Sequence, residues 1–112
     1  MAVYVSNLVI YTGTDFEQIF VLEGSDSNSA LDLTGYTGAS KFKKYKSSTT
    51  SHSFDVTFTN RLSGNIKIGM GASMTDDLKP GKYFYDVNIT SPSGVTSRVV
   101  EGQVLIKKAV TR

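Results

Sequence analysis

One stretch of the chain alternates apolar and polar side chains more regularly than any other. The apolar positions of this stretch share one parity and are Tyr83, Tyr85, Val87 and Ile89. Because successive side chains of a strand point to opposite faces, the pattern predicts a strand with one buried face. The pair Pro80-Gly81 directly before it marks a turn.

The start of this strand also predicts a particular tertiary contact. Tyr83 follows Gly81 by two residues, which is typical of the tyrosine corner of immunoglobulin-like β-sandwiches. A buried phenol oxygen needs a hydrogen-bond partner, so we expect the Tyr83 hydroxyl to bond to backbone between Asp76 and Lys79. Tyr85 lies where an antibody domain has its second cysteine, and we expect its side chain to be buried as well.

Alternation, or short apolar runs between turn residues, predicts the remaining strands. We expect them at residues 3–11, 15–22, 30–33, 36–46, 54–59, 66–68 and 95–107. The first changes parity near Ser6-Asn7, which predicts a bulge or a passage between two sheets. The second becomes apolar on both faces, as a central strand does, whereas the lysines of residues 36–46 favour a sheet edge. In the last strand, Glu101-Gly102 is the expected bulge.

The segments between these strands contain the residues of tight turns. Gly35 ends one apolar run, and Ser91-Pro92-Ser93-Gly94 has the composition of a hairpin turn. Residues 69–78 have no strand pattern, and we expect a helical turn there with Ser73 as N-cap and Asp76 as its partner. The sequence therefore predicts an all-β fold. It is a single immunoglobulin-like β-sandwich domain, residues 1–112, of about seven to eight strands with at most one short helical turn near residues 72–78.

Composition narrows the classes of partner. The 112 residues contain no cysteine, which excludes a disulfide framework and thiolate metal sites. The formal net charge of +2 is too small to predict nucleic acid or an anionic membrane as a partner. No apolar run approaches the ~20 residues that span a bilayer, and the first residues lack the features of a signal peptide. We therefore expect a protein made in a cytoplasm, with no membrane partner.

The side chains that carry catalysis or bind metals are sparse. His52 is the one histidine, and we expect it in a solvated loop of serine and threonine. Asp76 and Asp77 are adjacent on a turn, which favours capping over convergence on one point. Residues 41–46 interleave lysines with aromatic residues, as single-stranded nucleic acid surfaces do, but alternation places Phe42 in the core. No catalytic residue, metal ligand or cofactor site is predicted, and nucleic acid is not an expected partner.

The order and spacing of several short motifs are similar to those of a known group of proteins. The motifs are residues 15–16 (DF), 31–36 (LDLTGY), 41–44 (KFKK), 64–68 (GNIKI), 74–78 (MTDDL), 80–87 (PGKYFYDV), 93–94 (SG) and 100–104 (VEGQV). Together they resemble the small immunoglobulin-like virion structural proteins of tailed phages, including those of cyanophages, and the amino-terminal domain of phage baseplate upper proteins. The resemblance implies a non-enzymatic virion subunit, either a tail or baseplate accessory protein or a capsid decoration protein. Such a subunit would bind other phage virion proteins in many copies or as a homo-oligomer.

Two sets of residues carry these expectations. Structural roles are expected for Tyr83, Tyr85, Pro80, Gly81 and Gly35. The first strand is long, apolar on both parities and almost uncharged, so it or the tail after Ile106 is expected to pack on a neighbouring virion protein, by strand addition. The expected contacts are Tyr4, Leu8 and Ile10, with Lys107, Lys108 and Arg112 at the rim.

Two alternatives stay open at this point. The first strand can instead pair inside its own sandwich. The protein can also be a host-surface or carbohydrate-binding module of the particle, in which an exposed tyrosine stacks on sugars. The candidates for such stacking are Tyr4, Tyr11, Tyr36 and Tyr45.

Overall fold

The computed structural model describes residues 3–23, 31–45 and 51–110. The described chain is built from strands, with one turn of 3₁₀-helix and one turn of α-helix. The strands are β1 (Tyr4–Val5), β2 (Leu8–Tyr11), β3 (Phe16–Val21), β4 (Thr37–Lys43), β5 (His52–Asn60), β6 (Asn65–Met70), β7 (Gly81–Thr90) and β8 (Thr96–Lys107). The helical turns are η1 (Arg61–Ser63) and α1 (Ala72–Thr75), and neither described helix is long and apolar enough to cross a membrane.

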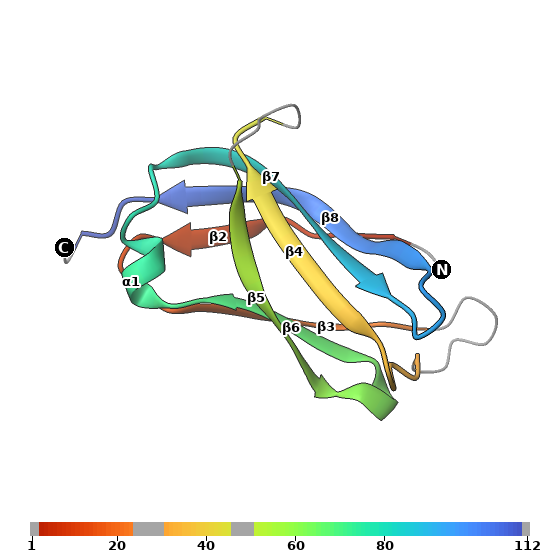
Figure 1. Cartoon of the computed structure of the whole chain (residues 1–112). Helices are drawn as coiled ribbons and strands as arrows, with labels where there is room; N and C mark the ends of the chain where they lie inside the picture. The colour runs from red at the N-terminus through yellow and green to blue at the C-terminus, as the bar shows by residue number, and fades with distance from the viewer. Residues whose placement is uncertain (1–2, 24–30, 46–50, 111–112) are drawn as a thin grey trace.

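The strands form a curled sheet that folds into two layers (Figure 1). Its order is β1-β8-β7-β4-β5-β6-β3, and β2 also pairs with β8. The beginning of β5, His52 to Phe54, pairs with β4, and the part from Asp55 onward pairs with β6. Strand β5 therefore carries the chain from one layer to the other, and the predicted all-β, immunoglobulin-like fold is confirmed.

The core lies between the two layers. Its fully buried or nearly buried side chains include Leu8, Ile10, Phe42, Phe54, Ile66, Ile68, Tyr85, Val87, Ile89, Val104 and Ile106. Strand β7 shows the predicted alternation, because its buried residues fall on one parity along its whole length. An aromatic cluster joins β4, β5 and β7: the Phe42 ring contacts the Phe54 ring at 4.7 Å and the Tyr83 ring at 5.5 Å between centroids.

The predicted tyrosine corner is present. Tyr83 lies at the start of β7, and its hydroxyl donates a hydrogen bond of 2.8 Å to the carbonyl of Lys79. The turn Pro80-Gly81 reverses the chain between these two groups. It follows α1 and lies at the end of the sandwich where β2 and β8 finish (Figure 1). Gly35, at the turn before β4, has φ of 79°, and a Cβ there would come within 2.7 Å of the Pro92 side chain.

Three predicted positions in the sheet are wrong. Residues 31–33 form no strand, although Leu33 is buried and its N–H donates to Arg61 O at 2.8 Å. Strand β4 lies between β7 and β5 and is not an edge, so its lysines project from a central strand. Strand β3, predicted as central, ends the sheet, and the apolar Ile19 and Val21 on its outer face are exposed.

Two local predictions also differ from the structure. The N-cap of α1 is Gly71 and not Ser73, and the Asp15 carboxylate, far away in sequence, accepts a 2.7 Å hydrogen bond from the Ala72 N–H. His52 is not a loop residue: it begins β5 and stacks on Phe42 with 5.0 Å between ring centroids. Pairing with β4 places the imidazole beside the aromatic core. The residues around His52 in the sequence are polar and therefore did not indicate this position.

We predict that Tyr83→Phe lowers the free energy of unfolding by about 1 to 3 kcal/mol, because the Lys79 carbonyl loses its partner in a half-desolvated corner. Chemical denaturation measures the change. Tyr11→Phe is the matched control, since Tyr11 is exposed on β2, and it should leave the stability within error. Equal stability of wild type and the Tyr83 variant would show that the corner hydrogen bond has no energetic role.

Candidate functional site

The side chains on the solvent side of β8, β7 and β4, together with those of β1 and β2, form a continuous surface that we call the outer face. Strand registers place its residues in rows across the strands. One row holds Val9, Leu105 and Lys82, the next holds Gln103, Phe84 and Lys43, and a third holds Val5, Glu101, Asp86 and Lys41. The face is therefore apolar toward β2, polar along β8 and β7, and cationic along β4.

A β-bulge in β8 decides which charges reach this face. The register between β7 and β8 shifts between Val87 and Asn88, whose partners are Val100 and Arg98, so Val99 is the extra residue. Val99 and Val100 are consequently both fully buried. In a regular strand, residues three positions apart point to opposite faces, but the bulge returns Arg98 and Glu101 to the same face. The predicted bulge at Glu101-Gly102 was thus misplaced.

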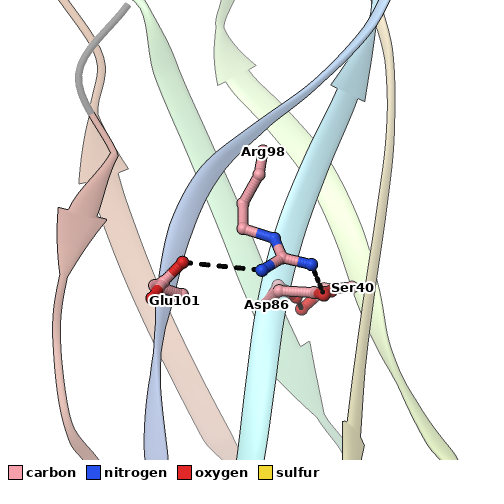
Figure 2. A network of polar contacts seen from close by, with 4 residues as sticks. All are labelled: Ser40, Asp86, Arg98 and Glu101. Atoms are coloured by element: carbon pink, nitrogen blue, oxygen red, sulfur yellow. Dashed lines mark hydrogen bonds and ion pairs between the residues drawn. The ribbon is translucent and has the colours of Figure 1, made fainter. Parts of the chain in front are cut away.

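The bulge allows Arg98 to bridge two carboxylates (Figure 2). Asp86 and Glu101 lie directly opposite each other in the β7–β8 register, where two like charges repel. The Arg98 guanidinium lies 3.0 Å from the Asp86 carboxylate and 3.5 Å from that of Glu101. Because all three side chains are substantially exposed, the network adds little stability and mainly fixes where these charges lie.

A groove of about 780 Å³ crosses the outer face around this network. Its polar lining includes the amides of Asn7, Asn88 and Gln103, and its floor includes Ser40, whose buried hydroxyl donates 2.6 Å to the Asp86 carbonyl. Within the described part of the chain, no carboxylate lies within ion-pair distance of Lys41 or Lys43 on the groove's β4 side. The groove therefore offers amide hydrogen bonds together with positive charge.

The border of the groove along β1 and β2 is fastened at Ser6-Asn7. Between the two strands, Ser6 N–H donates to Glu101 O at 3.0 Å, and Asn7 Oδ1 accepts from Gln103 N–H at 3.1 Å. The Tyr85 hydroxyl donates 2.7 Å to Ser6 O, and burial raises the pKa of this phenol to about 12. Gly102 is required here, because any Cβ at this position would overlap Ser6 O.

The hydrogen bonds at Ser6-Asn7 explain why the first strand is interrupted there. The predicted role of this strand in binding a partner also changes. The bulge or passage between sheets that was expected at Ser6-Asn7 is wrong, because β1 and β2 both pair with β8, in parallel and in the same register. Leu8 and Ile10 are 5% and 1% exposed, so they belong to the protein's own core and cannot contact a partner as predicted. The opposite parity, Val5 and Val9, is the exposed one.

The other predicted contact residues have mixed outcomes. Tyr4 is 38% exposed, and Lys107 and Lys108 are exposed at the end of β8, whereas Arg112 lies outside the described residues. Phe42 is completely buried, which removes a stacking platform from the nucleic acid interpretation of residues 41–46. Tyr4 and Tyr11 pair with β8 residues seven positions apart, a separation of about 23 Å along a strand, so they cannot hold the same sugar ring.

Sequence reasoning did not identify the outer-face residues themselves. Arg98, Asp86 and Glu101 looked like ordinary solvated charges, because their convergence depends on the register of β7 with β8. The available signal was the pair Val99-Val100 between two charged residues, which breaks the alternation of the last strand. In the described part of the chain, no three histidine, aspartate or glutamate side chains gather as they would around a metal ion.

No protein-family model and no curated protein sequence matches this chain. Among solved structures, an internalin-like protein of Listeria monocytogenes is similar over 96% of this chain, at 13% identity and a TM-score of 0.46, and the chain spans 28% of that protein's length. A structure from photo-crosslinking work on multimeric cell-adhesive interactions of VGSC beta subunits is similar over 94% of this chain and 92% of its own, at 11% identity and a TM-score of 0.43. These likenesses concern the fold alone, and neither protein is from a phage.

The raised pKa of Tyr85 predicts how stability depends on pH. The folded protein keeps the phenol proton up to about pH 12, whereas the unfolded chain loses it near the ordinary pKa of 10.0. The contribution of Tyr85 to stability is therefore complete below pH 10.0 and is lost as the pH rises toward 12. Denaturation of wild type and Tyr85→Phe from about pH 8 to pH 12 should show a stability difference that is constant at first and then shrinks. A difference that stays constant over the whole range would contradict this assignment.

Proposed function

We propose that this chain is a binding domain of a phage particle, which attaches through its outer face to another virion protein and is present in many copies. The observation that carries the proposal is the composition of that face. Exposed Val9 and Leu105 lie side by side in register, and the row of Gln103, Phe84 and Lys43 separates them from the Arg98 network. Exposed apolar side chains bordered by charged and hydrogen-bonding groups are typical of protein interfaces.

The charge distribution indicates what the partner surface should contain. Asp86 and Glu101 share the single positive charge of Arg98, and the three lysines Lys41, Lys43 and Lys82 make the net charge of these side chains positive toward a partner. A complementary surface would place acidic residues opposite β4 and apolar residues opposite Val9. The phage origin of that partner is supported by the order of the sequence motifs.

The proposal assigns no catalytic step to the protein. Asp86, Arg98 and Glu101 of the groove pair with one another, and no nucleophile is polarised by a neighbouring base among them. His52, the chain's histidine, stacks on Phe42 inside the aromatic cluster. These contacts support structural roles for His52, Asp86 and Glu101, whose side chains are of the types that perform acid–base chemistry in enzymes.

A second candidate function is glycan binding in the same groove. Its volume is within the range of small-ligand sites, and Asn7, Asn88 and Gln103 offer both donors and acceptors for sugar hydroxyls. A glycan array probed with the purified wild-type protein separates the two candidates. Saturable binding that Asn88→Ala abolishes would favour this second function over attachment to a virion protein.

Particle occupancy tests the first candidate directly. Tagged wild type or the double variant Val9→Glu/Leu105→Glu is supplied during infection of the source host, and the copies per purified particle are counted by mass spectrometry. Wild type should remain on the particle in many copies, and two carboxylates in the apolar part of the interface should lower the occupancy by at least about tenfold.

The matched control is Leu62→Glu. Leu62 is 72% exposed on η1, which is not part of the outer face, so this substitution adds a carboxylate elsewhere and should leave occupancy unchanged. Melting curves of all variants confirm that they fold. Wild type absent from purified particles, or a folded double variant at wild-type occupancy, would refute the proposal.

A further inference from the structure

The outward side chains of β3, β6 and β5 form a second surface, on the other layer of the sandwich, that we call the back face. Its residues are Glu17, Ile19, Val21, Asn65, Lys67, Asp55 and Thr57. Ile19 and Val21 are 49% and 56% exposed, two positions apart on the same side of β3. The back face therefore presents two neighbouring apolar side chains to solvent.

The back face also carries an acidic row. Glu17 and Asp55 lie on either side of Gly69 in the strand register, and because Gly69 has no side chain the surface is hollowed there by about 260 Å³. Lys67 lies 3.8 Å from the Glu17 carboxylate, whereas in the described part of the chain no cation lies within ion-pair distance of Asp55. The back face thus combines exposed apolar side chains with carboxylates.

This is the composition that the outer face requires of a partner, and the spacing agrees as well. On the outer face, Lys43 lies two residues along and two strands across from Leu105. On the back face, Asp55 lies two residues along and two strands across from Ile19. At about 3.4 Å per residue and 4.8 Å per strand, both separations are about 12 Å.

Two facing surfaces fit only if their patterns turn in opposite senses when each is viewed from solvent. Glu101 C=O points toward the amino-terminal segment, where it accepts from Ser6 N–H. Leu22 N–H points toward β6, where it donates to Gly64 O, so the outward-facing residues of β3 direct their backbone groups away from β6. In an upward strand of L-residues, a residue whose side chain points at the viewer directs its N–H and C=O to the right. Seen from solvent, β7 and β4 therefore lie to the left of an upward β8, and β6 and β5 lie to the left of an upward β3.

The two patterns meet this condition. On the outer face, the path from an apolar residue to two lysines turns counter-clockwise, through Leu105, Lys82 and Lys43. On the back face, the path from an apolar residue to two acids turns clockwise, through Ile19, Glu17 and Asp55. The outer face of one copy is therefore complementary to the back face of another.

We propose that the outer face of one copy of this chain docks on the back face of a second copy. Two apolar pairs and two ion pairs then form together: Leu105–Ile19, Val9–Val21, Lys43–Asp55 and Lys82–Glu17. The strands of the two copies cross at a steep angle, as in orthogonal packing of sheets. The inference rests on the proposed function, because it uses the outer face as the binding surface and names a second copy as its partner.

The remaining charged side chains are compatible with this docking. In the same placement Lys67 lies over Gln103 and stays beside Glu17, and Asp86 faces the hydroxyl of Thr57. No two like charges are placed directly opposite each other, so repulsion does not disfavour the contact.

A contact between two different faces does not end with a pair. Each copy keeps one unused face, so the copies continue into a stack or close into a ring. A copy attached to the particle by its outer face presents its back face outward, where the next copy binds. The contact therefore supplies a way to carry many copies.

Sedimentation of the purified protein, without phage, tests the contact. Wild type should grow beyond a dimer as its concentration rises, and added salt should reverse this growth. Lys43→Glu and Asp55→Lys should each raise the concentration needed for association by at least about tenfold. Lys79→Glu and Asp77→Lys make the same charge changes at exposed positions of the segment before β7 and should have no effect.

Mixing the two interface variants tests the pairing itself. In an equimolar mixture, the Lys43→Glu protein can dock on the Asp55→Lys protein and the reverse, so association should return to near the wild-type level. Wild type that stays monomeric at every concentration, or a mixture that associates no better than its components, would overturn the proposal. Melting curves check folding, and Lys82→Glu with Glu17→Lys replaces the pair if either variant unfolds.

This outcome is separate from that of the proposed function. Wild type that is monomeric in solution, but is present on particles in numbers that Val9→Glu/Leu105→Glu lowers, would overturn only the contact between copies. Association in solution that the mixture restores, without any copies on particles, would support that contact and refute the proposed function.

Discussion

The hydrogen bond from the Tyr85 hydroxyl to Ser6 O determines where the amino-terminal segment lies. A phenol on the inner parity of β7 must find an acceptor, and the break between β1 and β2 supplies one. Gly102 leaves room for the same carbonyl, and Asn7 completes the junction through Gln103. The amino-terminal segment therefore pairs with β8 and extends the sheet beyond it. The opposite end of the sheet is β3.

The outer face follows from this arrangement. With β1 and β2 beside β8, the exposed Val9 meets Leu105 and extends the outer face with an apolar border. The bulge at Val99 adds Arg98 to the same face, where its guanidinium lies between two opposed carboxylates and reduces their repulsion. Because the amino-terminal segment is fixed at β8, it does not cover the edge of β3.

The order of apolar, polar and turn residues along the sequence predicted the features that depend on neighbouring residues. Alternation from Tyr83 to Ile89 identified β7, and the spacing of Gly81 and Tyr83 identified the corner hydrogen bond to Lys79. The position of a strand within a sheet depends on pairing between distant segments, so β3 and β4 were assigned to the wrong places. The same reason applies to the site, since a strand that is apolar on both parities, like residues 3–11, does not reveal which parity its neighbours will bury.

Residue-resolved hydrogen exchange tests most directly whether the amino-terminal segment is fastened to β8. The Ser6 N–H bonds to Glu101 O, and the Gln103 N–H bonds to Asn7, so both are protected only while the junction is intact. If the fastening is part of the cooperative fold, these two amides should exchange through global unfolding, as slowly as the amides in the middle of β7. Exchange of the Ser6 amide orders of magnitude faster than that of Val87 would show that the segment detaches on its own, and would contradict the account.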